Sequence, residues 1–257
     1  MSRQHLTFEC EGSQLVGTLD DGLEATGLLL VGGGNELRAG AWSGQAQFAA
    51  RIAAEGFPVF RFDRRGVGDS EGGNGEFRTA GPDIAAALAA FRAQCPRVTR
   101  VIGLGNCDAA SALMLSGGAG LHSLILSNPW TIENESEQAP PEQVRDHYRK
   151  RLADPAAFKR LLTGKVSLGQ LAGSLISALR PSAPPSSLAQ DMASGIAGFA
   201  GPIRFLIAAN DRTGRAFVSA WQTGDSRIRT CAGASHSFVE PASREWLFAQ
   251  VLEALRD

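Results

Sequence analysis

Short apolar runs and helix-type patterns alternate along most of this chain. The apolar runs lie at 27–34, 57–63, 98–105, 122–127, 203–209 and 226–233. Segments with helical periodicity separate or follow them, at 42–56, 82–94, 107–115, 214–222 and 243–257. Because several runs are apolar without alternation, we expect strands that are buried on both faces, which is typical of a parallel sheet covered by helices.

Two further strand-like runs precede this alternation. They lie at 6–11 and 14–19, and the Gly12-Ser13 pair between them predicts a β-hairpin. A hairpin followed by repeated strand–helix units predicts an α/β fold with a mostly parallel, doubly wound sheet.

The alternation stops between residues 131 and 200, where no strand pattern occurs. A charged segment comes first, and the Pro- and Ser-rich stretch 181–187 follows it. A bare loop of this length is uncommon between two strands of one sheet. We therefore expect a helical cap at 131–200, inserted into a core domain formed by residues 1–130 and 201–257.

Composition and charge exclude several classes of protein. The 257 residues include 25 Lys and Arg and 26 Asp and Glu, so the near-neutral balance argues against a general nucleic-acid binder. No apolar run reaches the ~18 residues of a membrane span, and the first residues carry no signal-peptide pattern, so we expect a cytoplasmic protein. The four cysteines form no C-x-x-C pair, and no metal-ligand spacing or phosphate-binding motif occurs. We expect free thiols, and neither a metal nor a cofactor.

Reactive residues follow the predicted strands. Cys107 comes directly after the strand that ends near Gly105, Asp211 follows the strand at 203–209, and His236 follows the last strand. Ligands of open α/β sheets bind beyond the carboxyl ends of the strands, so these side chains are expected to meet at one edge. Their chain order, nucleophile then acid then histidine, is that of one group of hydrolytic triads.

The residues around Cys107 predict a strained strand-to-helix turn that exposes a nucleophile. Gly105 and Ala109 flank Cys107 two positions away on either side, so the segment reads G-x-C-x-A, with sulfur replacing the oxygen of G-x-S-x-G. Small residues are needed there because the helix crosses closely over the strand. The start of the helix also favours the thiolate form of a cysteine.

Each partner has an expected role in a reaction through an acyl-cysteine. His236 takes the thiol proton and later activates water, while Asp211 orients the imidazole. The oxyanion hole is expected to use backbone N–H groups from Asp108, Gly33, Gly34 and Asn35.

The acid of the triad has alternatives, whereas a second nucleophile motif and a dinucleotide motif are rejected. Glu133 or Glu135, after the strand at 122–127, could supply the acid in place of Asp211. Ser70 lies in a literal G-x-S-x-G, but neither a strand nor a helix flanks it, so we expect a structural role. The segment 103–108 begins like a dinucleotide fingerprint but lacks its third glycine.

Basic residues dominate the segment 145–165 within the predicted cap. The ordinary interpretation is a solvated helix face. The alternative is a surface for an anionic partner, such as a carrier-bound acyl group or an anionic glycan.

Five motifs together resemble the α/β-hydrolase superfamily. They are RFDRRGVGDSEG, GLGNCDAASA, SNPW, NDRTGRAF and GASHSF, at 61–72, 103–112, 127–130, 210–217 and 233–238. Within the superfamily, the chain is most similar to the type 1 exosortase A system-associated hydrolases, whose turn also carries cysteine. The resemblance implies the α/β-hydrolase fold, Cys107, Asp211 and His236 as the triad, and a link to exosortase and exopolysaccharide genes of Gram-negative bacteria.

The chain departs from that group after its third strand. The group is expected to have Gly-Gly-Pro-Gln where this chain reads GGGNELRAG at 32–40. Arg38 keeps its place, whereas Gly34 and Asn35 differ, which points to a different acyl-side preference. We assign substrate contacts to Arg38 and Asn106.

The sequence therefore predicts a cysteine hydrolase that cleaves an ester or thioester. We expect its substrate to be a small-molecule or carrier-bound acyl compound. Acyl transfer from the same site, or a non-catalytic accessory or binding role, are the alternatives. The intact set Cys107, Asp211 and His236 favours catalysis, since function resides in the site rather than in the fold. The pattern leaves the oligomeric state open.

Overall fold

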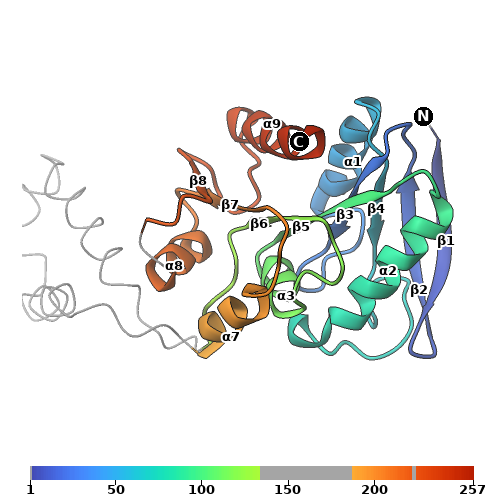
Figure 1. Cartoon of the computed structure of the whole chain (residues 1–257), viewed down its shortest axis with the longest axis horizontal. Coiled ribbons are helices and arrows are strands. Elements are labelled where there is room, and N and C mark those ends of the chain that lie inside the picture. Colours follow the sequence, from blue (N-terminus) through green and yellow to red (C-terminus); the bar gives the residue numbers. More distant parts are fainter. Residues whose placement is uncertain (1, 134–186, 222–223) are drawn as a thin grey trace, which may run out of the picture.

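A single sheet organises the protein (Figure 1). The computed structural model describes residues 2–133, 187–221 and 224–257. In these residues the strands are β1 (Arg3–Cys10), β2 (Ser13–Asp20), β3 (Thr26–Val31), β4 (Val59–Phe62), β5 (Arg100–Asn106), β6 (Ser123–Ser127), β7 (Ile203–Ala208) and β8 (Ile228–Cys231). Their order is β1-β2-β4-β3-β5-β6-β7-β8. The hairpin β1–β2 and the pair β2–β4 are antiparallel, and the other neighbours are parallel, which confirms the predicted fold.

Helices cover both faces of the sheet. The described helices are α1 (Gly44–Ala54), α2 (Gly81–Gln94), α3 (Asp108–Leu115), α7 (Ser187–Ile196), α8 (Arg212–Ala220) and α9 (Pro241–Arg256), with short 3₁₀ turns η1 (Ala41–Ser43) and η2 (Phe77–Thr79). Figure 1 shows α1 and α9 on one face, and α2, α3, α7 and α8 on the other. None of these helices is long and apolar enough to cross a membrane.

Strand β3 shows why its sequence does not alternate between apolar and polar residues. Leu28 and Leu30 belong to the core cluster beneath α1 and α9, whereas Leu29 and Val31 belong to the cluster beneath α2 and α3. All four side chains are at most 5% exposed. Because both faces are buried, every position from Leu28 to Val31 is apolar, as expected for a central parallel strand.

The register of the ladder brings the carboxyl ends of the central strands together. Val31 pairs with Gly105, Asn106 pairs with Ser127, and Ser127 pairs with Leu206. The loops after β3, β5, β6 and β7 therefore leave from one edge of the sheet. This is the edge where open α/β sheets bind ligands.

Most of the predicted cap, residues 134–186, lies outside the described residues. Its last part, α7, packs against α3. Leu188, Met192 and Ile196 of α7 are buried in the same cluster as α2 and α3. This helix thus belongs to the packing of the core, and the division into a core and a cap stays a prediction.

Candidate active site

Cys107 occupies the tip of the turn between β5 and α3. Its backbone has φ 61° and ψ −126°, in the region that side-chain-bearing residues rarely adopt. A Cβ on Gly105 would lie 2.7 Å from the carbonyl carbon of Ala109, in the backbone of α3. Only glycine therefore allows this close crossing, which is the physical reason for the small residue two positions before Cys107.

His236 and Asp211 form a pair beside this turn. His236 Nδ1 lies 3.0 Å from Asp211 Oδ2, and the Asp211 side chain is almost fully buried. Asp211 is also the N-cap of α8, where its carboxylate accepts the Gly214 N–H at 2.8 Å. This cap explains why α8 begins at Arg212, two residues before the predicted helix. Because Nδ1 faces the carboxylate, Nε2 is the nitrogen left for the sulfur.

The pKa values of this pair favour opposite charges. The hydrogen bond to Asp211, and then a hydrogen bond with Cys107, raise the pKa of His236 to about 10, while burial acts in the other direction. Burial by itself would raise the pKa of Asp211, but hydrogen bonds from His236 and from the Gly214 N–H outweigh it and hold that pKa below its usual value. The imidazole is thus prepared to accept and hold the thiol proton.

Two asparagines hold the histidine loop in place. Asn128 is fully buried, and its Nδ2 donates to the His236 carbonyl at 3.0 Å and to Asn106 Oδ1 at 3.1 Å. Its Oδ1 accepts the Ala208 N–H at 2.8 Å. Asn106 Nδ2 in turn lies 3.4 Å from His236 Nε2 and 3.4 Å from the His236 carbonyl. The structure therefore places Asn106, which we assigned to the substrate, against the histidine.

Asn128 has no role in the prediction from sequence, although it lies in the SNPW motif at 127–130. Its φ of 42° is a left-handed conformation that asparagine tolerates better than most residues. A buried polar residue at a strand end is the signal that could have identified it. Its amide ties together the ends of β5, β6 and β7 and the loop after β8.

The predicted oxyanion hole is partly occupied by a side chain. The carboxylate of Asp108 accepts the Gly34 N–H, at 2.9 Å to Oδ1 and 2.8 Å to Oδ2. A Cβ on Gly33 would lie 2.4 Å from Asp108 Oδ1, so glycine is needed there for the contact. The Asp108 N–H is in the first turn of α3 and has no acceptor within the helix. Among the described contacts, the N–H groups of Gly33 and Asn35 also keep no acceptor.

Arg38 lies in an ion-pair network beside this loop. Its guanidinium pairs with the buried Asp63 and, at 2.9 Å, with the exposed Asp69. Its backbone N–H donates to Asp63 at 2.6 Å, and its Nε donates to Thr18 at 3.2 Å. These contacts hold the loop after β3 against the loop after β4. The side chain of Asn35 accepts a hydrogen bond from Asn74 at 2.7 Å.

Glu133, the alternative acid, and Ser70, which lies in the literal G-x-S-x-G, make their contacts outside the Cys107 site. Glu133 accepts from Arg78 at 3.2 Å and from Ser187 at 2.7 Å, whereas the acid in contact with His236 is Asp211. Ser70 Oγ donates to the Asp63 carbonyl at 2.7 Å and accepts the Val16 N–H at 2.9 Å, a structural arrangement. Glu135 and the basic segment 145–165 lie outside the described residues.

The fold and this edge of the sheet define an α/β hydrolase with a cysteine at its strand-to-helix turn. The family model described as "Alpha/beta hydrolase family" matches residues 28–250, and the chain belongs to this family. This confirms the predicted superfamily and the prediction of a hydrolase. A search of curated protein sequences found no match.

Solved structures of other proteins share the fold. The esterase Pf2001 of Pyrococcus furiosus is 14% identical with a TM-score of 0.63, over 99% of this chain and 90% of that chain. The α/β hydrolase GrgF from Penicillium sp. sh18 is 17% identical with a TM-score of 0.63, over 100% and 98%. A proline iminopeptidase of Mycobacterium smegmatis is 15% identical with a TM-score of 0.59, over 98% of each chain.

Proposed function

We propose that this chain is a cysteine hydrolase that cleaves an ester or thioester through an acyl-cysteine intermediate. The observation that carries the proposal is the combination of a cysteine at φ 61° with a histidine–carboxylate pair of 3.0 Å beside it. Strained backbone persists where the surrounding structure holds it, and it gathers at active sites. The esterase among the structures that share this fold supports the choice of substrate bond.

The geometry suggests the following steps. His236 takes the Cys107 proton, the thiolate attacks the substrate carbonyl carbon, and a tetrahedral oxyanion forms. Collapse of this intermediate breaks the bond to the leaving alcohol or thiol, which receives the proton from His236. Water then attacks the acyl-cysteine while His236 accepts its proton. Collapse of the second tetrahedral intermediate breaks the S–C bond, the carboxylic acid leaves, and His236 returns the proton to the Cys107 sulfur. The N–H of Asp108 faces the developing oxyanion in this scheme.

The test is covalent labelling followed by intact-protein mass spectrometry. The protein is incubated with p-nitrophenyl esters and acyl-thioesters of several chain lengths, and the adduct is mapped. We expect one acyl group on Cys107, no adduct on Cys107→Ala, and a slower reaction of Cys107→Ser. Cys231→Ala is the matched control, because Cys231 is a buried cysteine outside the turn and its loss should leave the labelling intact.

Labelling elsewhere, or equal turnover by Cys107→Ala, would contradict the proposal. Adding acceptor alcohols or amines to the same reaction separates hydrolysis from acyl transfer, since transfer gives a new ester or amide in place of the free acid.

We also propose that the chain acts in the cytoplasm with an exosortase and exopolysaccharide system. The support is the resemblance of its motifs, including the cysteine of GLGNCDAASA, to the type 1 hydrolases of that system. Deleting the gene in its host and complementing it with wild type or Cys107→Ala tests the link. A change in exopolysaccharide that only wild type restores is the expected result, and unchanged exopolysaccharide would contradict it.

A further inference from the structure

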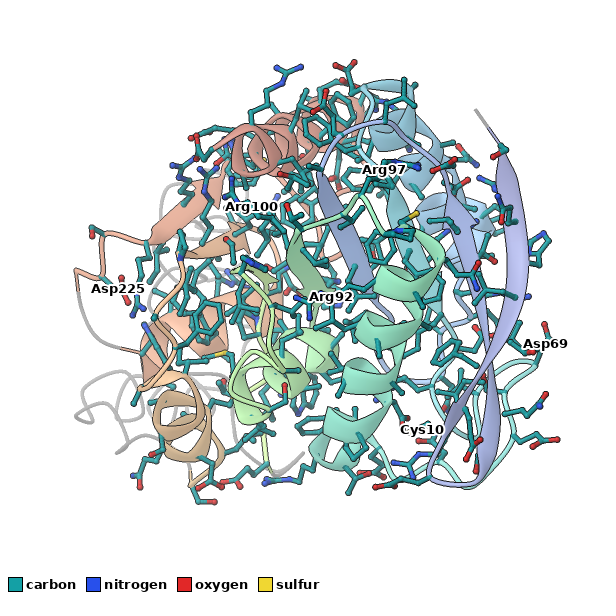
Figure 2. The ribbon with its side chains drawn as sticks, turned by 45° about the vertical axis from the view of Figure 1, so that its right-hand side comes forward. Cys10, Asp69, Arg92, Arg97, Arg100 and Asp225 are labelled. Atoms are coloured by element: carbon teal, nitrogen blue, oxygen red, sulfur yellow. The ribbon has the colours of Figure 1, made fainter. Side chains whose placement is uncertain are left out.

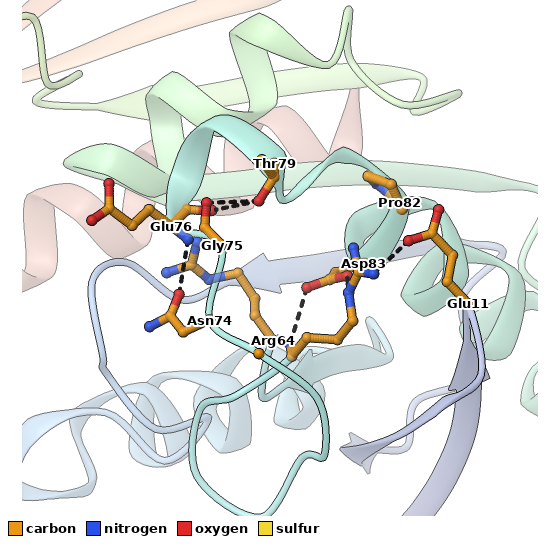
Figure 3. Close-up of a pocket in the computed structure, with 10 residues that line it drawn as sticks. Glu11, Arg64, Asn74, Gly75, Glu76, Thr79, Pro82 and Asp83 are labelled. Carbon is orange, nitrogen blue, oxygen red and sulfur yellow. Dashed lines mark hydrogen bonds and ion pairs between the residues drawn. The ribbon is translucent and has the colours of Figure 1, made fainter.

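A cavity of about 420 Å³ opens beside the loop that contacts the Cys107 turn. Its walls come from the end of β4, the segment around η2 and the start of α2, and Figure 3 shows its lining. The volume lies in the range of small-molecule sites. The cavity is at the carboxyl-end edge of the sheet, on the side of β4 rather than of β7 and β8.

Arg64 is the unusual member of this lining. It is 5% exposed, yet it takes part in no ion pair with any residue that the structure describes. Its one hydrogen bond within the described part of the chain goes to the Gly34 carbonyl. A guanidinium carries five N–H donors, so most of the Arg64 donors have no acceptor among the described residues. Burying a cation without a counter-charge is costly, and an anion in the cavity would offset that cost.

Five charged residues line the cavity, namely Glu11, Arg64, Arg65, Glu76 and Asp83. Arg65 pairs with Asp83, with Nε 2.5 Å from Oδ1, and also with Glu11. In Figure 3, Asp83 and Glu11 lie on one side of the cavity, whereas Arg64 extends toward Gly75 on the other. Glu76 forms no ion pair with a described residue, and in Figure 3 its carboxylate lies at the outer edge of the lining, far from Asp83 and Glu11. Among the described residues, Arg64 is therefore the lining cation that remains for an anionic ligand.

The Cys107 turn and this guanidinium are linked through a single residue. The N–H of Gly34 contacts Asp108, the residue after Cys107, and the carbonyl of Gly34 contacts Arg64. In addition, η2, which contributes Thr79 to the cavity, packs against α3. The cavity is thus joined to the Cys107 turn through Gly34 and through the packing of η2 against α3.

We propose that Arg64 and this cavity bind an anionic group of the substrate, a carboxylate or a phosphate. The inference rests on the proposed function and specifies its substrate class: an ester or thioester with a negative charge a few atoms from the reactive carbonyl. Guanidinium matches both anions through paired, charge-assisted hydrogen bonds.

The kinetic test compares a neutral ester with esters that carry a carboxylate at increasing distance from the reactive carbonyl. We would measure kcat/KM for p-nitrophenyl butyrate and for the mono-p-nitrophenyl esters of succinate, glutarate and adipate. The preference of wild type for its best anionic ester should fall about 10- to 100-fold in Arg64→Gln, because one charged hydrogen-bonding partner is lost. Arg64→Lys keeps the charge without the planar fork and should give an intermediate preference.

The matched control is Arg92→Gln. Arg92 lies near the end of α2, whereas Asp83, which lines the cavity, lies at the start of the same helix. Figure 2 labels Arg92 apart from Cys10, the residue of β1 that contacts Asp83. This variant should keep the wild-type preference. The same preference in wild type, Arg64→Gln and Arg64→Lys would overturn the proposal.

A binding test that needs no turnover separates this inference from the proposed function. Glutarate and inorganic phosphate are each added to Cys107→Ala and to Cys107→Ala/Arg64→Gln, and the melting temperature is recorded. A rise that requires Arg64 is expected, and the anion with the larger rise identifies the source of the charge. No rise with either anion would overturn the site. A rise that requires Arg64, with no ester labelling Cys107, would refute the proposed function instead.

Discussion

Replacing Cys107 by glycine should stabilise the protein relative to replacing it by alanine. At φ 61° and ψ −126°, a residue with a Cβ is strained, whereas glycine is not. Such a conformation costs about 1–3 kcal/mol. Glycine loses about 0.5–1 kcal/mol more than alanine when the chain is ordered. The central values of these two ranges differ by about 1 kcal/mol, so Cys107→Gly should be more stable than Cys107→Ala by about that amount.

Comparing the glycine variant with the alanine variant isolates the free-energy cost of the backbone conformation at position 107. Both variants lose the sulfur, its hydrogen bond with His236 and its contacts, so these contributions cancel. The control is the same pair of substitutions at Cys231 in β8, a buried cysteine without a positive φ. At that position glycine should be less stable than alanine by about 0.5–1 kcal/mol, so the order of the two variants reverses.

Equilibrium urea unfolding, followed by circular dichroism, measures these differences. In a chain of this size, each 1 kcal/mol corresponds to a shift of about 2–4 °C in Tm. Neither variant should form an acyl adduct. If Cys107→Gly proved no more stable than Cys107→Ala, the turn would store no strain, and strain could not support the assignment of the nucleophile.

Three further predictions concern buried charge and hydrogen bonding. The hydrogen bonds to Asp211 and to Cys107 raise the pKa of His236 from 6.5 to about 10, so protonation of His236 stabilises the fold fully below the unfolded value of 6.5, and this contribution is lost as the pH rises through about 10. Asp211→Asn should lower that pKa and flatten the loss in urea unfolding, and an unchanged pH dependence would contradict the assigned contact. Asn128→Asp replaces a donor that faces the His236 carbonyl and should cost about 1–3 kcal/mol or more and slow ester cleavage; wild-type stability and kinetics would refute its positioning role. Asp20→Ala leaves the buried Arg61 unpaired and should cost about 3–5 kcal/mol in thermal unfolding, so a loss below about 1 kcal/mol would argue against that ion pair.

The sequence by itself determined the class of fold and the turn that carries Cys107. Apolar periodicity is a local property, and it located the strands and helices of the described residues to within a few positions. The hairpin around Gly12 and the close crossing at Gly105 also depend on neighbouring residues in the chain. Cys107, Asp211 and His236 each follow a predicted strand of a mostly parallel sheet. Because the carboxyl ends of parallel strands lie at one edge, these positions were sufficient to predict that the three residues gather there.

Only the tertiary structure decided which side chains meet at that edge. It placed Asp211 rather than Glu133 against His236, and it brought β4 between β2 and β3. It also directed Asn128 to the histidine loop and gave Arg64 no counter-charge from the residues that the structure describes. Contacts of this kind join residues far apart in the chain, and their geometry depends on strand order and side-chain direction. A one-dimensional pattern of apolar and polar residues encodes neither of these.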